Sequence, residues 1–105
     1  MKPITETEFQ DLVLKLALMF GWRRAHFRPA ETKKGWRTAV SGDGKGFPDL
    51  LLIRGKTLIV AELKRSRKEV PTPEQEAWLA AFRGAGIPAY LWTPEDWSTI
   101  EGVLR

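Results

Sequence analysis

The 105-residue sequence contains no cysteine, which excludes disulfide bonds and thiolate metal sites. No apolar run reaches the ~18 residues that a membrane-spanning helix needs. The first residues, MKPITETEF, do not form a signal peptide pattern, because acidic residues precede the apolar stretch. We therefore expect a soluble, cytoplasmic protein with no membrane contact, folded as a single domain over residues 1–105.

Histidine is also scarce, since His26 is the only one. A lone histidine on a strand is more often structural than catalytic, so general acid-base chemistry by histidine is not expected. The 17 Lys and Arg residues exceed the 13 Asp and Glu residues, which gives a net charge of +4. This surplus makes a polyanion such as nucleic acid the first partner to consider.

The central stretch, residues 46–65, reads GFPDLLLIRGKTLIVAELKR. Two apolar runs, residues 50–53 and 57–63, flank a turn signal at residues 54–56, a pattern that predicts a β-hairpin. Three charged residues border this hairpin: Asp49 precedes the first run, and Glu62 and Lys64 end the second. Charged side chains are rarely placed beside buried aliphatic ones without a partner or a function.

Strand geometry brings these charges together. Side chains alternate faces along a strand, so Glu62 and Lys64 project from the same side. A loop with an even number of residues places Asp49 opposite Glu62, whereas an odd loop without a bulge places Asp49 on the other face. We predict the even register, or a compensating bulge, with two carboxylates and one ammonium in a single patch.

The segment before the hairpin begins with a predicted helix over residues 6–20. Thr5 is its expected N-cap with Glu8 as capping-box partner, and Gly21 ends it. Glu6 lies on the edge of the helix that faces the core, although first-turn acids are also favoured by the helix dipole alone. The apolar stripe is expected at Phe9, Leu12, Val13, Leu16 and Phe20.

A strand is expected at residues 22–28, followed by a long polar, glycine-rich connection at residues 29–47. The connection carries several Lys and Arg residues around Trp36. Such a combination can bind phosphates and stack on bases. The alternative is a solvated loop whose tryptophan is buried in the core. The residues expected to contact nucleic acid are Arg24, Arg28, Lys33, Lys34, Trp36, Arg37, Lys45, Arg65 and Arg67.

After the hairpin, Thr72 and Pro73 begin a second helix as N-cap and first residue. Gln75 either closes its capping box or belongs to the candidate site, and both alternatives remain open. This helix ends at Gly84 or Gly86. Its buried stripe is expected at Ala77, Trp78, Ala81 and Phe82.

Another strand is expected at residues 87–92. The capping pattern at residues 93–96 predicts the start of a last helix. The order is therefore α, β, β, β, α, β, α. Both faces of the central hairpin are apolar, so helices are expected on both faces of the sheet in an α/β fold. The inward residues of the last helix are expected to be Trp97, Ile100, Val103 and Leu104.

Two carboxylates at a sheet edge, joined by a third from a helix, form an oxygen-rich site suited to a hard cation such as Mg²⁺ or Mn²⁺. A neighbouring lysine can orient water and balance developing negative charge. These groups are what metal-assisted hydrolysis of a phosphodiester requires.

With Pro48-Asp49 and Glu62-Leu63-Lys64 in these places, the chain resembles the PD-(D/E)xK nuclease superfamily, which has a restriction-endonuclease-like αβββαβ core with a mixed sheet. More closely it resembles the stand-alone VRR-NUC family, often found in phages and related to Holliday-junction resolvases. The resemblance covers nearly the whole chain: Glu6 with Gln10, and residues 46–50, 62–64 and 72–75.

This resemblance implies a structure-selective DNA endonuclease that depends on Mg²⁺ or Mn²⁺ and is commonly a homodimer. It implies that Asp49 and Glu62 are metal ligands, helped by the Leu63 carbonyl and by Glu6, and that Lys64 positions the attacking water. Gln75 matches a recurrent position of the family. Glu8 also matches an acid seen there, so Glu6 and Glu8 both remain open as the helix ligand.

Two other functions remain open from the sequence. A nucleic-acid-binding module on the same fold would use the cations without cleaving, and a restriction-type or nicking nuclease would recognise base sequence. A homodimer would supply two sites for symmetric cleavage of a junction. Trp92, Trp97 and the last helix offer candidate apolar surface for it. The expected setting is a bacterial or phage-infected cell.

Overall fold

The structure is a computed structural model that describes residues 3–27, 30–32, 35–37 and 42–105, without the side chains of residues 30–32 and 35–37. None of the helices in these ranges is both long and apolar enough to cross a lipid bilayer. In chain order the elements are α1 (Glu6–Met19), β1 (Arg23–His26), β2 (Ala30–Thr32), β3 (Gly35–Arg37), β4 (Leu50–Arg54), β5 (Thr57–Leu63), α2 (Pro73–Gly84), β6 (Ala89–Trp92), the 3₁₀ helix η1 (Pro94–Asp96) and α3 (Trp97–Leu104).

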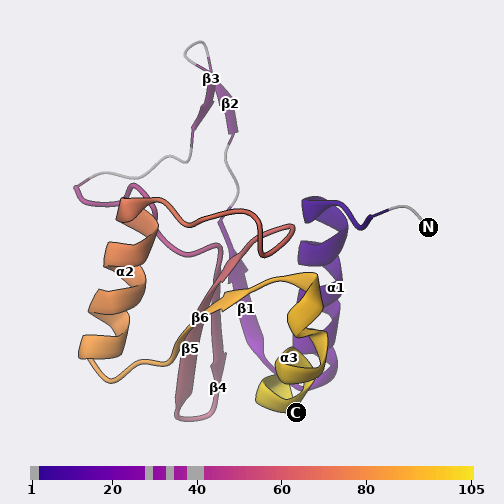
Figure 1. The fold of residues 1–105 in the computed structure, drawn as a ribbon. Coiled ribbons are helices and arrows are strands. Elements are labelled where there is room, and N and C mark those ends of the chain that lie inside the picture. The colour runs from indigo at the N-terminus through magenta and orange to yellow at the C-terminus, as the bar shows by residue number, and fades with distance from the viewer. Residues whose placement is uncertain (1–2, 28–29, 33–34, 38–41) are drawn as a thin grey trace.

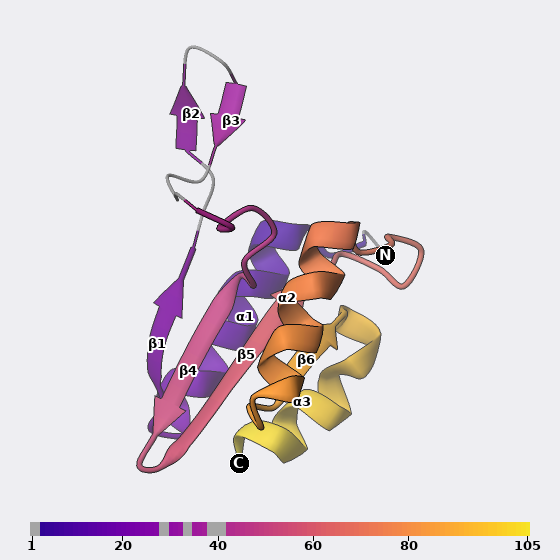
Figure 2. The same cartoon turned by 90° about the vertical axis from the view of Figure 1, so that its left-hand side faces the viewer.

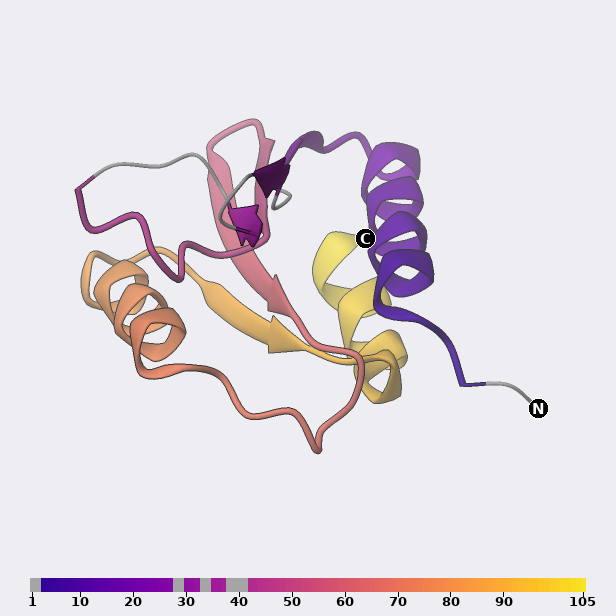
Figure 3. The same ribbon diagram turned by 90° about the horizontal axis from the view of Figure 1, so that it is seen from above.

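The main sheet contains four strands in the order β1-β4-β5-β6. The β1–β4 and β4–β5 pairs are antiparallel, whereas β5 and β6 are parallel, so the sheet is mixed. Helix α2 covers one face, and α1 and α3 cover the other (Figures 1 and 3). The predicted α/β architecture, with helices on both faces and a C-terminal helix, is confirmed.

The register of the β4–β5 hairpin is the predicted even one. Ile53 pairs with Leu58, and Leu50 pairs with Ala61. The turn between the strands therefore consists of two residues, and its first, Gly55, has a φ of 60°, which favours glycine. Extending the ladder by one step places Asp49 opposite Glu62.

The core lies mainly between the sheet and the α1–α3 pair. Helix α1 contributes Phe9 and Val13, and α3 contributes Ile100 and Leu104, all at most 1% exposed. A smaller cluster on the other face joins Val60 and Leu79. Burial of each large aliphatic side chain contributes about 1.5–3 kcal/mol, so both clusters hold the helices that flank the sheet.

Two predicted helix stripes need correction. Leu12 is 43% exposed, and Ala17 is buried instead on the core-facing side of α1. In α2 the predicted Ala77 and Ala81 are exposed, and Leu79 is the fully buried residue. An alanine side chain buries little surface, so the larger apolar residues set the rotation of α2. The face that α2 turns toward the sheet carries Gln75, Trp78, Leu79 and Phe82.

The last helix follows the prediction more closely, with Ile100 and Leu104 buried and Trp97 and Val103 packed against the same cluster. Trp92, however, is 2% exposed and belongs to the core. It is therefore not part of an apolar surface on which a second copy could bind.

The expected polar connection at residues 29–47 contains an additional hairpin. Strands β2 and β3 pair with each other as a separate two-stranded sheet. The hairpin projects beyond the end of the main sheet (Figures 1 and 2). Strands of three residues are too short for an alternating pattern to be recognised in the sequence. A hydrogen bond of 2.9 Å from the Phe27 N–H to the Asp49 carbonyl joins the two ends of this connection.

Candidate active site

The candidate site lies at the end of the sheet where β4 begins and β5 ends. Asp49 immediately precedes β4, Glu62 is near the end of β5, and Lys64 follows that strand. In Figure 1 this is the upper edge of the sheet, with the first turns of α1 and α2 on either side and the β2–β3 hairpin above. Both layers of helices can therefore contribute side chains to it.

Asp49 is fixed by contacts of its side chain and its backbone. Its Oδ2 accepts a hydrogen bond of 2.8 Å from the Leu63 N–H, which ties the carboxylate to the end of β5. The N–H and C=O of one strand residue point to the same side, so the Leu63 carbonyl also lies on the side of Asp49. Burial raises the pKa of Asp49, although the Leu63 hydrogen bond opposes the shift.

Glu62 is the most deeply buried charged group of the site, at 3% exposed. Its Oε2 accepts a hydrogen bond of 2.9 Å from Gln75 Nε2 and lies 3.6 Å from Lys64 Nζ. Its Oε1 is buried and receives no hydrogen bond from the part of the chain that the structure describes. Burial, followed by the negative charge of Asp49, raises the pKa of Glu62 to about 8.

Gln75 fulfils both of the roles that the sequence left open. Its Oε1 accepts a hydrogen bond of 2.9 Å from the Thr72 N–H and closes the capping box of α2. Its Nε2 donates to Glu62. Because Thr72 supplies a donor and Glu62 supplies an acceptor, only one orientation of the amide satisfies both.

The segment before Asp49 packs closely against the start of α2. Gly46 has a φ of 83°, and a Cβ atom built on it would lie 2.6 Å from the Glu74 carbonyl carbon and 2.7 Å from the Gln75 nitrogen. Phe47 packs edge-on against Trp78, with ring centroids 4.9 Å apart. The segment that leads into Asp49 and the helix that carries Gln75 are therefore held together. Sequence reasoning missed this role of Gly46, for which a glycine just before Phe47-Pro48-Asp49 was the available signal.

The two acids of α1 have different surroundings. Glu8 Oε1 accepts a hydrogen bond of 3.1 Å from the Thr5 N–H and closes the capping box of α1. Glu6 does not take part in that box, and its charge is one of the causes that raise the pKa of Asp49. Of the two, Glu6 is the carboxylate whose charge acts on Asp49.

The donor set can be tested against a divalent cation. No group of three His, Asp or Glu residues with metal-binding geometry occurs among the residues that the structure describes. The structure does bring together the carboxylates of Asp49 and Glu62 beside the Leu63 backbone, all hard oxygen donors. The buried Oε1 of Glu62 lacks a hydrogen-bond donor, as a ligand oxygen without its cation would. These residues fit Mg²⁺ or Mn²⁺.

The predicted nucleic-acid contacts are only partly described. Lys45 pairs with Glu74, Arg65 with Glu69 and Arg67 with Asp96, whereas Arg24 donates to the Leu14 carbonyl. The side chains of Arg28, Lys33, Lys34, Trp36 and Arg37 lie outside the described residues.

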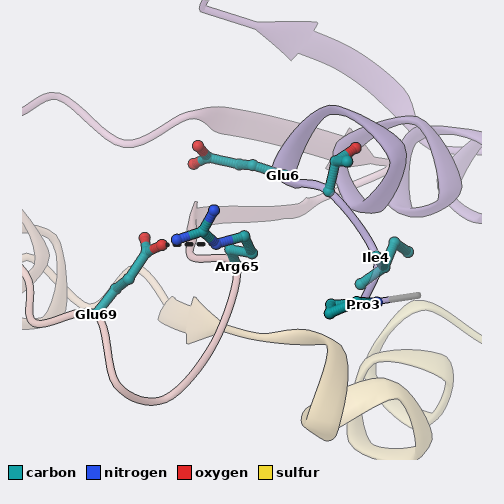
Figure 4. Close-up of a pocket in the computed structure, with 6 residues that line it drawn as sticks. Pro3, Ile4, Glu6, Arg65 and Glu69 are labelled. Carbon is teal, nitrogen blue, oxygen red and sulfur yellow. Dashed lines mark ion pairs between the residues drawn. The ribbon is translucent and has the colours of Figure 1, made fainter. Parts of the chain in front are cut away.

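A pocket of about 390 Å³ opens beside the site, and no sequence pattern predicted it. The start of α1 forms one wall and the loop after β5 forms the other (Figure 4). Its lining residues are Pro3, Ile4, Thr5, Glu6, Arg65 and Glu69.

Comparison of the sequence with protein-family models gives no match, and neither does comparison with curated proteins. Among solved structures, a VRR_NUC domain superposes with a TM-score of 0.69 at 19% identity, covering 94% of this chain and 92% of that chain. A VRR_NUC domain protein gives 0.59 at 22% identity, covering 98% and 87%. Hjc, a Holliday junction resolvase from Archaeoglobus fulgidus, gives 0.46 at 26% identity, covering 81% and 64%. The first two likenesses extend over almost the whole of both chains and show a shared fold.

Proposed function

We propose that this chain, which has the fold of VRR_NUC domains, is a divalent-metal-dependent endonuclease that hydrolyses phosphodiester bonds in branched or otherwise structured DNA. The observation that carries the proposal is the meeting of Asp49, Glu62 and Lys64 at one end of the sheet. This combination of two carboxylates and an ammonium has the chemistry that phosphodiester hydrolysis requires.

In this proposal, Asp49, Glu62 and the Leu63 carbonyl hold Mg²⁺ or Mn²⁺, and Glu6 completes the set from α1. When bound, the cation supplies a Lewis acid and positive charge at the scissile phosphate. The protein contributes a rigid arrangement of oxygen donors, because the Leu63 N–H orients Asp49 and Gln75 orients Glu62.

Lys64 orients the attacking water and stabilises the negative charge that develops on the phosphate. Its Nζ lies 3.6 Å from Glu62 Oε2, and its side chain is 14% exposed, so the ammonium is held beside the proposed metal ligands. The water oxygen forms a bond to phosphorus and releases one proton to solvent, one bridging P–O bond breaks, and the departing oxygen takes a proton from solvent.

Branched DNA is the favoured substrate because these 105 residues, folded around one sheet, offer little surface of their own for base reading. Backbone and shape are then the features to recognise. One active site cuts one strand, so we propose that two copies act together on a symmetric junction. Sedimentation at the concentration used for cleavage measures that assembly.

Cleavage by active-site variants tests the function. Asp49→Ala and Lys64→Ala should each lower the cleavage rate by at least about 100-fold, because the first removes a ligand of the cation and the second removes the ammonium that stabilises the reacting phosphate. Affinity for DNA should change less than about threefold, since most affinity comes from phosphate contacts elsewhere. The substrates are a four-way junction, a flap and a plain duplex, each with Mg²⁺, Mn²⁺ or EDTA. Lys56→Ala is the control, because Lys56 lies in the turn at the opposite end of the hairpin.

Each outcome separates the proposal from its rivals. Full activity in either variant contradicts the proposed mechanism. Cleavage of plain duplex at one sequence, with no preference for the junction, indicates a restriction or nicking nuclease. Binding of DNA without cleavage, and without Mn²⁺ binding that depends on Asp49, indicates a non-cleaving nucleic-acid-binding module.

A further inference from the structure

The pocket beside the candidate site is connected to it through two chain segments. Glu6 lines the pocket, and the first turn of α1, which carries Glu6, lies beside the end of the sheet where Asp49 and Glu62 meet (Figure 1). Arg65 lines the opposite wall and directly follows Lys64 in the chain. A polymer held at Asp49 and Lys64 would therefore have its next unit near this pocket.

The positive charge in the pocket is the guanidinium of Arg65, which forms an exposed ion pair. Arg65 Nε lies 3.1 Å from Glu69 Oε1, and the two side chains are 62% and 34% exposed. Figure 4 shows the Arg65 side chain between the carboxylates of Glu6 and Glu69. Exposed pairs of this kind are weak, so another anion can replace Glu69 at little cost. A phosphate is a suitable replacement, because a guanidinium binds it through two parallel hydrogen bonds.

The wall opposite Arg65 is partly apolar. Pro3 and Ile4 supply apolar surface at the start of the chain, and Ile4 also packs against the core. An arginine that can bind phosphate lies on one side, and apolar side chains lie on the other. This combination suits the phosphate and the sugar of one nucleotide. The pocket volume of about 390 Å³ leaves room for such a group.

We propose that this pocket binds the DNA phosphate next to the scissile one, with Arg65 as its ligand. Glu69 holds the guanidinium in place until the phosphate replaces it. The inference rests on the proposed function, because it takes the scissile phosphate to lie at Asp49 and Lys64.

DNA binding in EDTA tests the pocket independently of cleavage. The measurement is fluorescence anisotropy of a labelled four-way junction between 50 and 200 mM salt. Arg65→Ala should weaken binding by about tenfold and reduce the slope of log K against log salt by about one. Glu69→Gln should tighten binding by about threefold, because it removes the competing carboxylate.

A matched control is present at the other end of the molecule. Arg105 and Glu101 form an i,i+4 pair of 3.8 Å, with side chains 72% and 39% exposed. Arg105→Ala and Glu101→Gln make the same charge changes at similar exposure, at the C-terminus of α3 far from the site (Figure 1). They should alter affinity less than twofold.

Neutral phosphate substitutions identify the contact itself. A single methylphosphonate linkage is moved one step at a time along one strand of the junction, across the branch point. One linkage next to the scissile position should weaken binding by the wild-type protein about as much as Arg65→Ala does. The same linkage should cause little further loss in the Arg65→Ala protein, since the contact is already absent.

The inference is overturned if Arg65→Ala and Arg105→Ala weaken binding equally, if Glu69→Gln fails to tighten it, or if no linkage shows the coupling. These results are distinct from a failure of the nuclease proposal. Coupling between Arg65 and one linkage in a protein that never cleaves would retain the pocket and reject the hydrolysis.

Discussion

Gln75 shows how one side chain can satisfy two requirements at once. A glutamine amide has an acceptor oxygen and a donor nitrogen on the same group. The oxygen closes the capping box with Thr72, and the nitrogen binds Glu62. The start of α2 and the orientation of a candidate metal ligand thus depend on the same residue.

Replacement of Gln75 should therefore affect stability and activity together. Gln75→Ala should lower the free energy of unfolding by about 0.5–2 kcal/mol through loss of the cap. It should also lower the cleavage rate by about 10–100-fold, because Glu62 loses the partner that orients it. Chemical denaturation and junction cleavage measure the two effects.

The capping box of α1 supplies the control for this variant. Glu8 closes that box with Thr5 in the same way, but it makes no described hydrogen bond to the candidate site. Glu8→Ala should lower stability by a similar amount and leave the cleavage rate within about twofold of wild type. Equal losses of activity in the two variants would show that Gln75 acts only on the helix.

At the residue level, the sequence predicted the meeting of Asp49 and Glu62 because strand alternation and turn length fix the register. It left Gln75 ambiguous, since spacing alone does not show that an amide has two partners. The pocket beside the site was not predictable, because Glu6 and Arg65 on its two walls are 59 positions apart in the chain and meet only after folding.

At the level of elements, the contact between Gly46 and the first turn of α2 positions the candidate site. The close approach of the two backbones leaves no space for a side chain at this position. Gly46 also has a positive φ, so any other residue would be strained there as well.

Gly46→Ala should lower the free energy of unfolding by about 2–5 kcal/mol, the sum of left-handed strain and overpacking. It should also lower activity, because the displaced helix start carries Gln75. Gly55→Ala is the control, since Gly55 has a φ of 60° but nothing lies within 4 Å of an added Cβ atom. That variant should lose only about 1–2 kcal/mol, measured by the same denaturation. Equal losses in the two proteins would show that the contact with α2 contributes nothing.

Helix starts were the most predictable elements, because capping residues are local signals. Thr5 with Glu8 and Thr72 with Gln75 form the expected boxes. Helix rotation was less predictable, as the exposed Leu12 and Ala77 show. It depends on which neighbour the helix meets, and the sequence pattern does not contain that information.

For the molecule as a whole, the buried carboxyl pair makes stability depend on pH. The pKa of Glu62 is raised from 4.5 to about 8, chiefly by burial and then by Asp49. Asp49 shifts in the same direction. Between these pH values the folded protein binds more protons than the unfolded chain. Stability is therefore full below the unfolded pKa and is lost as the pH rises toward 8.

Thermal unfolding in EDTA should accordingly show a lower Tm at pH 8 than at pH 5.5. A difference of several degrees is expected, because about 1 kcal/mol corresponds to roughly 4–8 °C in a domain of this size. Mn²⁺ should raise Tm more at pH 8, where the carboxylates are ionised. Glu62→Gln, which stays neutral, should flatten the pH profile. Parallel profiles for the two proteins would contradict this origin.

The hydrogen bond between Phe27 and Asp49 has a consequence for how this fold can diversify. This hydrogen bond holds together the two ends of the connection between β1 and β4, at Asp49 itself, a candidate metal ligand. Insertions or deletions in the β2–β3 hairpin, well before Gly46, need not disturb the candidate site, because the anchor points at Phe27 and Asp49 stay fixed. The length and sequence of the β2–β3 hairpin can therefore vary without moving Asp49.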